Sequence, residues 1–174
     1  ADWVPVINAA YAKPDHERAN ELVEKAVKRV TGILKAGDRV GWGWSGDKDS
    51  QGLRVVMDKA GVDDCYLGLS ALEYPDFLAW ATNEMPDRLD IILNEKINID
   101  WLAKNPKMLF PNSAHASRWF AQVQGRARKI YAKKHKKDVL FLGRRKADWN
   151  QRPDYVESGT RVMSPIYDWS HEDL

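Results

Sequence analysis

Residues 40–50 read VGWGWSGDKDS, an apolar run that ends in a small, charged turn. The segment 39–44 predicts a short buried strand, in which Gly43 leaves room for another group to approach the backbone. Apolar residues at helical spacing resume directly after the turn. The stretch therefore predicts a strand, a tight turn and a helix in succession.

The turn itself has two interpretations. Ser45 and Gly46 allow a tight structural turn, and the same geometry directs backbone N–H groups at the start of the helix toward a bound anion. In the second interpretation Lys48 supplies a mobile cation and the Ser50 hydroxyl caps the helix. The spacing fits neither a Walker A loop nor G-x-G-x-x-G, so a phosphate cradle here would be of another kind.

The rest of the chain alternates between helical and strand-like spacing of its apolar residues. The helices are predicted over 15–34, 53–60, 74–85, 98–105 and 117–135, and the further strands over 64–70, 89–94, 138–143 and near 160–166. Asp15 is expected to cap the first helix and Gly61 to end the second. This alternation predicts a three-layer α/β fold, a mostly parallel twisted sheet of about five strands with helices on both faces.

Composition places the chain among ordinary globular proteins. Its 174 residues are 44% hydrophobic and 30% charged, which suits a single domain with a sizeable core. No apolar run approaches the roughly 18 residues of a membrane span, and we expect no membrane partner. The net charge of +2 demands no nucleic-acid partner, although residues 126–146 hold ten Lys or Arg against one Asp. A nucleic-acid surface there is one hypothesis, and a solvated basic face is the alternative.

The single cysteine, Cys65, excludes an internal disulfide and a Cys-rich metal site, and favours a cytoplasmic location. It lies in a predicted strand, where a buried, inert thiol is expected. The four histidines lack metal-ligand spacing; His115 could line a cleft, and a capping or surface role is its alternative. The start at Ala1 and the ending DWSHEDL predict that the natural chain is longer.

A second polar loop, FLGRRKADWNQRP over 141–153, follows the predicted strand 138–143. Ligands of parallel sheets bind beyond the carboxyl ends of the strands, where both polar loops are expected to lie. Arg144 and Arg145 could present planar forks to a phosphate or a sulfate. A solvated basic loop is the alternative.

The end of the chain, SPIYDWSHEDL over 164–174, has the pattern of a helix start. Ser170 is the predicted N-cap, and the acidic residues Glu172 and Asp173 suit the N-terminal dipole.

Three stretches resemble motifs of known families. The turn resembles the PP-loop, S-G-G-x-D-S, of the N-type ATP pyrophosphatases or adenine nucleotide alpha hydrolases, with Asp47 in place of the second Gly. The second loop resembles the G-x-R-R-x-x-(D/S) stretch of phosphoadenosine phosphosulfate (PAPS) reductases, and 164–174 resembles their P-L-x-D-W-(S/T)-x-x-D-(V/I) segment. In this order the motifs cover about four fifths of the chain and resemble the PAPS reductase-like branch of the PP-loop superfamily, with residues 1–15 as an N-terminal extension.

The resemblance implies a site for ATP and Mg²⁺. The residues implied to hold the adenine through their backbone are Gly43, Trp44, Leu69 and Ser70. Those implied at the phosphates are Ser45, Gly46, Asp47, Lys48, Ser50 and Gly143, with Asp49 as the partner of the loop or of Mg²⁺. Arg144 and Arg145 would meet the distal phosphate or sulfate, with Arg152 as a further match to the motif. Trp149 is a stacking group or a capping aromatic.

The first functional hypothesis is cleavage of ATP between the α- and β-phosphates, with adenylation of an unknown acceptor and release of pyrophosphate. PAPS or adenylyl sulfate reduction, or sulfur transfer, would need a cysteine beyond Leu174, because the reductases' E-C-G-x-H tail and paired cluster cysteines are absent from this sequence. A non-catalytic nucleotide-binding module, with Asp47 as the disabling change, is the other alternative. A monomer and a homo-oligomer both stay open.

Overall fold

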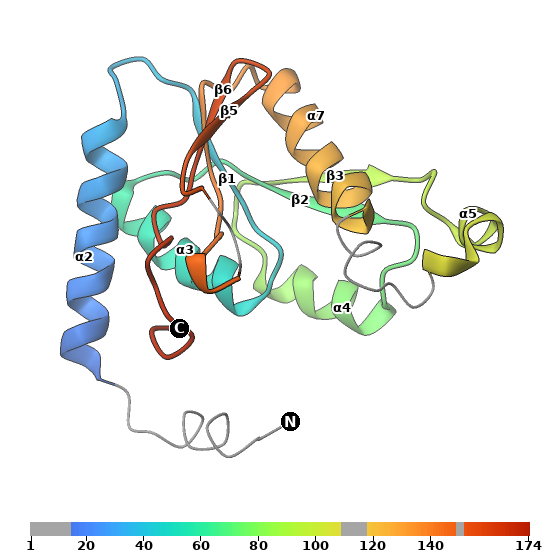
Figure 1. Ribbon diagram of the computed structural model, residues 1–174, viewed down its shortest axis with the longest axis horizontal. Coiled ribbons are helices and arrows are strands. Elements are labelled where there is room, and N and C mark those ends of the chain that lie inside the picture. Colours follow the sequence, from blue (N-terminus) through green and yellow to red (C-terminus); the bar gives the residue numbers. More distant parts are fainter. Residues whose placement is uncertain (1–14, 109–117, 149–151) are drawn as a thin grey trace.

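A six-stranded sheet forms the centre of the protein in a computed structural model, which describes residues 15–108, 118–148 and 152–174 (Figure 1). The strands are β1 (Val40–Gly43), β2 (Cys65–Ser70), β3 (Leu89–Asn94), β4 (Val139–Phe141), β5 (Tyr155–Glu157) and β6 (Thr160–Met163). Their order is β3-β2-β1-β4-β6-β5, and every neighbouring pair is parallel except β5 and β6. The expected mostly parallel α/β fold is confirmed.

The helices also match the predicted ranges, except that α3 begins at Lys48, within the predicted turn. They are α2 (His16–Ile33), α3 (Lys48–Ala60), α4 (Pro75–Glu84), α5 (Ile99–Lys104) and α7 (Arg126–Lys134). Asp15 caps α2 by accepting a hydrogen bond from the Arg18 N–H at 2.9 Å, and Gly61 ends α3 in a left-handed conformation, both as predicted. The helix predicted over 117–135 is described from residue 118 and includes a π-helical turn, η2 (Ala121–Gly125), before α7.

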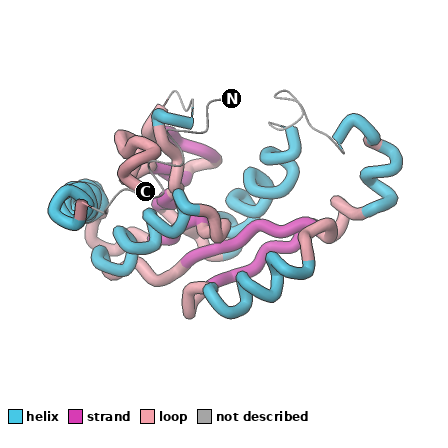
Figure 2. The backbone as a smooth tube through the Cα atoms, turned by 90° about the horizontal axis from the view of Figure 1, so that it is seen from below, coloured by secondary structure: helices cyan, strands magenta, loops and turns pink. Residues whose placement is uncertain are grey.

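Helices cover both faces of the sheet (Figure 2). Side chains alternate along each strand, so one strand can contribute apolar residues to the cores on both faces. On β4, Val139 and Phe141 join a core with α2 and α3, and Leu140 joins a second core with Tyr131 of α7. Side chains at the α3 interface such as Leu53 are fully buried. The predicted three-layer arrangement follows from these two cores.

The chain order makes β1 the switch point of the sheet. From β1 the chain runs outward through β2 to β3, and it then returns to place β4 on the other side of β1. Trp42 is in register with Cys65 on one side and with Phe141 on the other. The loops that follow β1 and β4 therefore emerge side by side, the place where parallel sheets bind ligands.

Two expectations about the fold need correction. The sheet has a sixth strand, β5, which forms a hairpin with β6 at the edge and was not predicted. The segment 164–174 forms turns, not a new helix. The Ser170 N–H donates to the Asp173 carboxylate at 2.7 Å, and Arg18 of α2 holds that carboxylate at 2.8 Å, so the segment stays a capped turn.

Candidate functional site

A cavity of about 260 Å³ lies at the carboxyl ends of β1 and β4, beside the first turn of α3. The predicted site residues among its lining are Gly43, Trp44, Ser45, Asp47, Ser50, Gly143 and Arg144. They come from two loops about a hundred positions apart in the sequence. The switch point of the sheet is what brings them together.

Gly46 sets the course of the loop after β1. Its φ is +79°, and a Cβ at this position would lie 2.5 Å from the ring of Trp80 in α4. Trp80 also stacks on Trp44, with their ring centroids 6.0 Å apart. Gly46 thus turns the chain and packs against α4, which explains why it is absent from the cavity lining.

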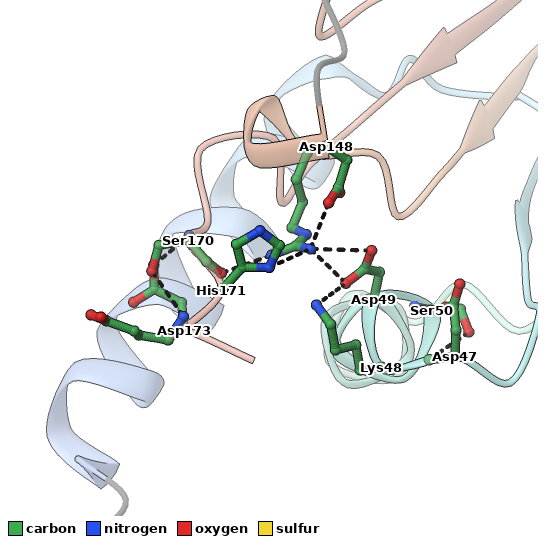
Figure 3. Close-up of polar contacts among 10 residues, drawn as sticks. Asp47, Lys48, Asp49, Ser50, Asp148, Ser170, His171 and Asp173 are labelled. Atoms are coloured by element: carbon green, nitrogen blue, oxygen red, sulfur yellow. Dashed lines mark hydrogen bonds and ion pairs between the residues drawn. The ribbon is translucent and has the colours of Figure 1, made fainter. Parts of the chain in front are cut away.

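Asp47 is the N-cap of α3, and the prediction that Ser50 caps this helix is wrong. The Asp47 carboxylate accepts a hydrogen bond from the Ser50 N–H at 2.8 Å, and the Ser50 hydroxyl donates to the Asp47 carbonyl at 3.0 Å (Figure 3). The carboxylate precedes the first turn and reaches its N–H groups, whereas Ser50 already lies inside the helix. One of the N–H groups expected to face a phosphate is therefore satisfied within the chain.

Lys48 and Asp49, two predicted phosphate or metal contacts, form an ion pair outside the cavity lining. The Lys48 ammonium lies 2.9 Å from the Asp49 carboxylate, and neither residue lines the cavity. Asp49 also lies 3.1 Å from the Arg145 guanidinium. The mobile cation predicted for the loop is thus engaged by its own neighbour in the sequence.

The two adjacent arginines have different surroundings. Arg144 lines the cavity, and its guanidinium lies 5.1 Å from the ring centroid of Tyr155. The Arg145 side chain is 1% exposed and lies outside the cavity lining. It donates to the Ser170 carbonyl at 2.9 Å and to the Asp148 carboxylate at 2.9 Å (Figure 3). Arg145 therefore joins α3, the turn at η3 (Lys146–Asp148) and the C-terminal segment, and only Arg144 is placed to meet a ligand.

Gly143 lies where the loop after β4 approaches the first turn of α3. A Cβ at this position would lie 3.0 Å from the Asp49 carbonyl oxygen. The backbone after β4 consequently passes directly against the first turn of α3. Gly143 keeps this contact short enough for both loops to share one cavity.

Leu69 and Ser70, the other residues predicted at the adenine, lie at the end of β2 and do not line the cavity. Ser70 is buried, and both its N–H and its hydroxyl donate to the Glu73 carboxylate at 3.0 Å. Leu69 and Ser70 thus belong to the end of β2, and the contacts of Ser70 are with Glu73 of the following loop. Trp149 and His115 lie outside the described residues.

Sequence reasoning missed five lining residues. They are Tyr66, Phe120, Gln124, Arg128 and Leu142. Strand alternation could have found Tyr66 and Leu142, whose neighbours in sequence face the other core. Burial raises the pKa of Tyr66, so its phenol stays neutral. Nothing in the basic run distinguished Arg128 from its neighbours.

Charge is distributed unevenly over the cavity. The Asp47 carboxylate lies beside α3, whereas Arg144 and Arg128 both approach the Tyr155 ring, Arg128 at 5.9 Å. The Arg128 Nε donates to Glu157 at 2.7 Å. An anionic group would be favoured near the guanidinium groups, and a cation or a hydrogen-bond donor near Asp47.

The expected magnesium ligand, Asp49, does not fit that role in this geometry. Lys48 and Arg145 both approach its carboxylate, whereas Mg²⁺ needs carboxylate oxygens that can enter its coordination shell. Asp47 lines the cavity and uses Oδ1 to accept from Ser50. Within the described residues, no three His, Cys, Asp or Glu side chains group closely enough to form a metal site of their own.

Comparisons with known proteins bear on the fold. No protein-family model matches the sequence, and no curated protein matches it. Among solved structures, the PAPS reductase of Candida auris, crystallised as a phosphate complex, superposes with a TM-score of 0.55 over 92% of this chain and 83% of that chain, at 14% identity. The chain has a PAPS reductase-like fold. The family resemblance inferred from the three motifs is thus confirmed at the level of the fold.

Two further placements complete the comparison with the sequence. Cys65 is fully buried outside the cavity lining, and burial raises the pKa of its thiol to about 12, as expected for an inert cysteine. In the part of the chain that the structure describes, every helix is too short or too polar to cross a bilayer.

Proposed function

We propose that the protein binds ATP, or a related adenine nucleotide, in the cavity at the ends of β1 and β4 and cleaves it between the α- and β-phosphates. The observation that carries this proposal is the meeting of two separate loops, with Ser45 and Ser50 from one and Gly143 and Arg144 from the other, in one cavity at the switch point of a PAPS reductase-like sheet. Cavities of this kind bind the nucleotide ligands of doubly wound folds.

The reaction would be an in-line substitution at the α-phosphorus. An oxygen of the acceptor forms a bond to the phosphorus, the bond to the bridging oxygen breaks, and pyrophosphate leaves with that electron pair. An acceptor hydroxyl would release its proton to solvent, and an acceptor carboxylate has none to release. Arg144 would stabilise the negative charge that develops during this exchange.

The other residues of the site would act by holding the two loops and the nucleotide in place. Gly143 would hold the loop after β4 against the first turn of α3. Gly43 leaves room for the lining side chains of Tyr66 and Leu142. Arg145 is a positioning residue, because its contacts with Asp49 and the Ser170 carbonyl fix α3 against the C-terminal segment. Mg²⁺ bound with the nucleotide would neutralise part of the phosphate charge, and Asp47 is the lining carboxylate that could contact it.

A second candidate function is a nucleotide-binding module without turnover. The hydrogen bond from the Ser50 N–H to Asp47 favours it, because this contact removes a donor that a phosphate would use. The pairing of Lys48 with Asp49 favours it as well.

Product analysis separates these functions. The protein is incubated with ATP and Mg²⁺, with and without candidate acceptors, and the products are resolved by ion-exchange chromatography. AMP or an adenylated acceptor together with pyrophosphate supports the proposed cleavage, and binding without products supports the module. ADP and phosphate would contradict α–β cleavage. Arg144→Ala should abolish turnover, whereas Arg88→Ala, which removes an exposed guanidinium remote from the cavity lining, should not.

A further inference from the structure

A second cavity, of about 430 Å³, lies at the opposite end of β4 from the candidate site. It is bounded by the last turns of α7, the start of β4 and the turn between β5 and β6, which lie together in Figure 1. Its lining includes the buried apolar side chains of Leu140 and Val162. The cationic residues that line it are Arg39, Arg128, Lys129, Lys133, Lys136 and Lys137, against two carboxylates, Asp138 and Glu157.

Of the cations in this cavity, Lys137 and Arg128 are buried and Lys129 is exposed, and each of the three has an acidic partner. The Lys137 side chain is 5% exposed, and its ammonium donates to the Val40 carbonyl and to Asp64, both at 2.6 Å. Arg128 is fixed by Glu157 at 2.7 Å, and Lys129 approaches the same carboxylate at 3.6 Å. The single negative charge of Glu157 is thus shared by two cations, so an excess of positive charge is left around it.

The cations at the rim are available to a partner. Lys133 and Lys136 are exposed, and neither has an acidic partner within the described part of the chain. Lys129 and Lys133 lie one turn of α7 apart, roughly 6 Å along the helix. Lys136 follows where the chain leaves the helix with a φ of +49°. Lys129, Lys133 and Lys136 thus follow one another along the end of α7 and the turn after it, and we call these three residues the lysine row.

From this row and the concave surface beneath it we infer that the cavity binds the phosphate backbone of a nucleic acid. A strand carries a negative charge every 3.4 Å or so along its axis, so lysines roughly 6 Å apart can meet phosphates that lie about two nucleotides apart. The described lining contains no aromatic ring on which a base could stack. The contacts are consequently to the backbone, and binding is independent of base sequence.

This surface is separate from the proposed nucleotide site, apart from Arg128, which lines both cavities. The test therefore leaves Arg128 unchanged and alters only the rim. Lys133→Ala/Lys136→Ala removes two exposed ammonium groups from the row. Lys25→Ala/Lys28→Ala is the matched control, because it removes two exposed lysines from α2, outside the lining of this cavity.

Binding of a fluorescein-labelled 20-mer of mixed sequence, single-stranded or duplex, is followed by anisotropy between 50 and 200 mM salt. We expect the wild type and the α2 control to bind alike. The rim variant should bind about tenfold more weakly, and on the duplex the slope of log affinity against log salt should fall in magnitude by about 2, or 0.9 per lost phosphate contact.

Circular dichroism melting of each variant confirms that the fold is intact. Failure of the wild type to bind at 50 mM salt would overturn the inference, as would an equal loss of affinity in both double variants. Competition by polyglutamate as effective as by unlabelled DNA would assign the surface to acidic proteins instead. None of these outcomes depends on ATP cleavage, so the proposed function is tested separately, by the product analysis.

Discussion

The Asp47 carboxylate lies 2.8 Å from the backbone nitrogen of Ser50 and accepts its hydrogen bond. The PP-loop motif that this turn resembles has glycine at this position, and a glycine has no side chain with which to occupy the N–H group. Here the chain supplies its own anion to the start of α3. The contact stabilises the helix and places a negative charge in the cavity lining.

We expect Asp47→Asn to strengthen the binding of ATP by about tenfold, because a like charge near the phosphates is worth on the order of 1 kcal/mol at a partly exposed site. The amide oxygen can still accept from Ser50, so the cap and the fold are kept. Titration calorimetry with ATP in the absence of Mg²⁺ measures the change, because Asp47 is also the lining carboxylate that could contact the metal. Asp76→Asn removes the same charge from the first turn of α4 and should leave the affinity unchanged. Weaker binding by Asp47→Asn without Mg²⁺ would contradict the expected repulsion and would mean that this carboxylate helps to hold the nucleotide directly.

The neighbouring arginines should respond to substitution in opposite ways. Arg145→Ala leaves Asp49 and Asp148 without their shared guanidinium, so we expect the free energy of unfolding to fall by about 3 kcal/mol. Arg144→Ala should change it by less than about 1 kcal/mol and should instead abolish turnover. Urea unfolding followed by tryptophan fluorescence provides the first measurement. Equal stability losses in the two variants would contradict the distinct placements of these side chains.

The sequence was informative where local chemistry decides the structure. The apolar spacing located α2, α3 and the parallel strands, and the glycines and serines of the turn located the cavity. It was less informative where tertiary packing decides. Strand β5 is a three-residue edge strand in a polar loop, with Val156 largely exposed, so it lacks a buried pattern.

The different placement of the Arg144 and Arg145 side chains could not be predicted from the sequence either. Adjacent residues of a loop can face opposite directions, and here the choice depends on Asp49 and the Ser170 carbonyl, which are distant in sequence. By contrast, the N-cap of α3 could have been predicted from the sequence. Asp is among the favoured N-cap residues, and Asp47 precedes Ser50 by the three positions that such a contact requires.

Acid should destabilise the protein partly through Asp138. The hydrogen bond from the Arg39 side chain, aided by the Arg39 N–H, lowers the pKa of Asp138 to about 2. A carboxyl whose pKa is lower in the folded state stabilises the fold above its unfolded pKa of about 4, and this contribution is lost as the pH falls toward 2. Unfolding measured between pH 2 and pH 6 should therefore show a steeper loss for the wild type than for Asp138→Asn, in which this group no longer titrates. Parallel curves for the two proteins would exclude the contribution.

Gly46→Ala tests whether the loop after β1 depends on its packing against α4. The left-handed backbone disfavours any side chain by roughly 1–2 kcal/mol, and the new methyl group would meet the Trp80 ring at 2.5 Å. We expect a loss of about 2–4 kcal/mol in the free energy of unfolding, since strain and overpacking add. Gly37→Ala is the matched control, because Gly37 also has a positive φ, +87°, but no neighbouring atom within 4 Å of its Cβ position. The loss of stability in Gly37→Ala should be limited to the backbone strain, so the difference between the two variants measures the contact with Trp80.

Trp80→Leu in the Gly46→Ala background should restore part of that difference if the ring is the obstacle. No restoration would place the strain in the backbone of the loop alone.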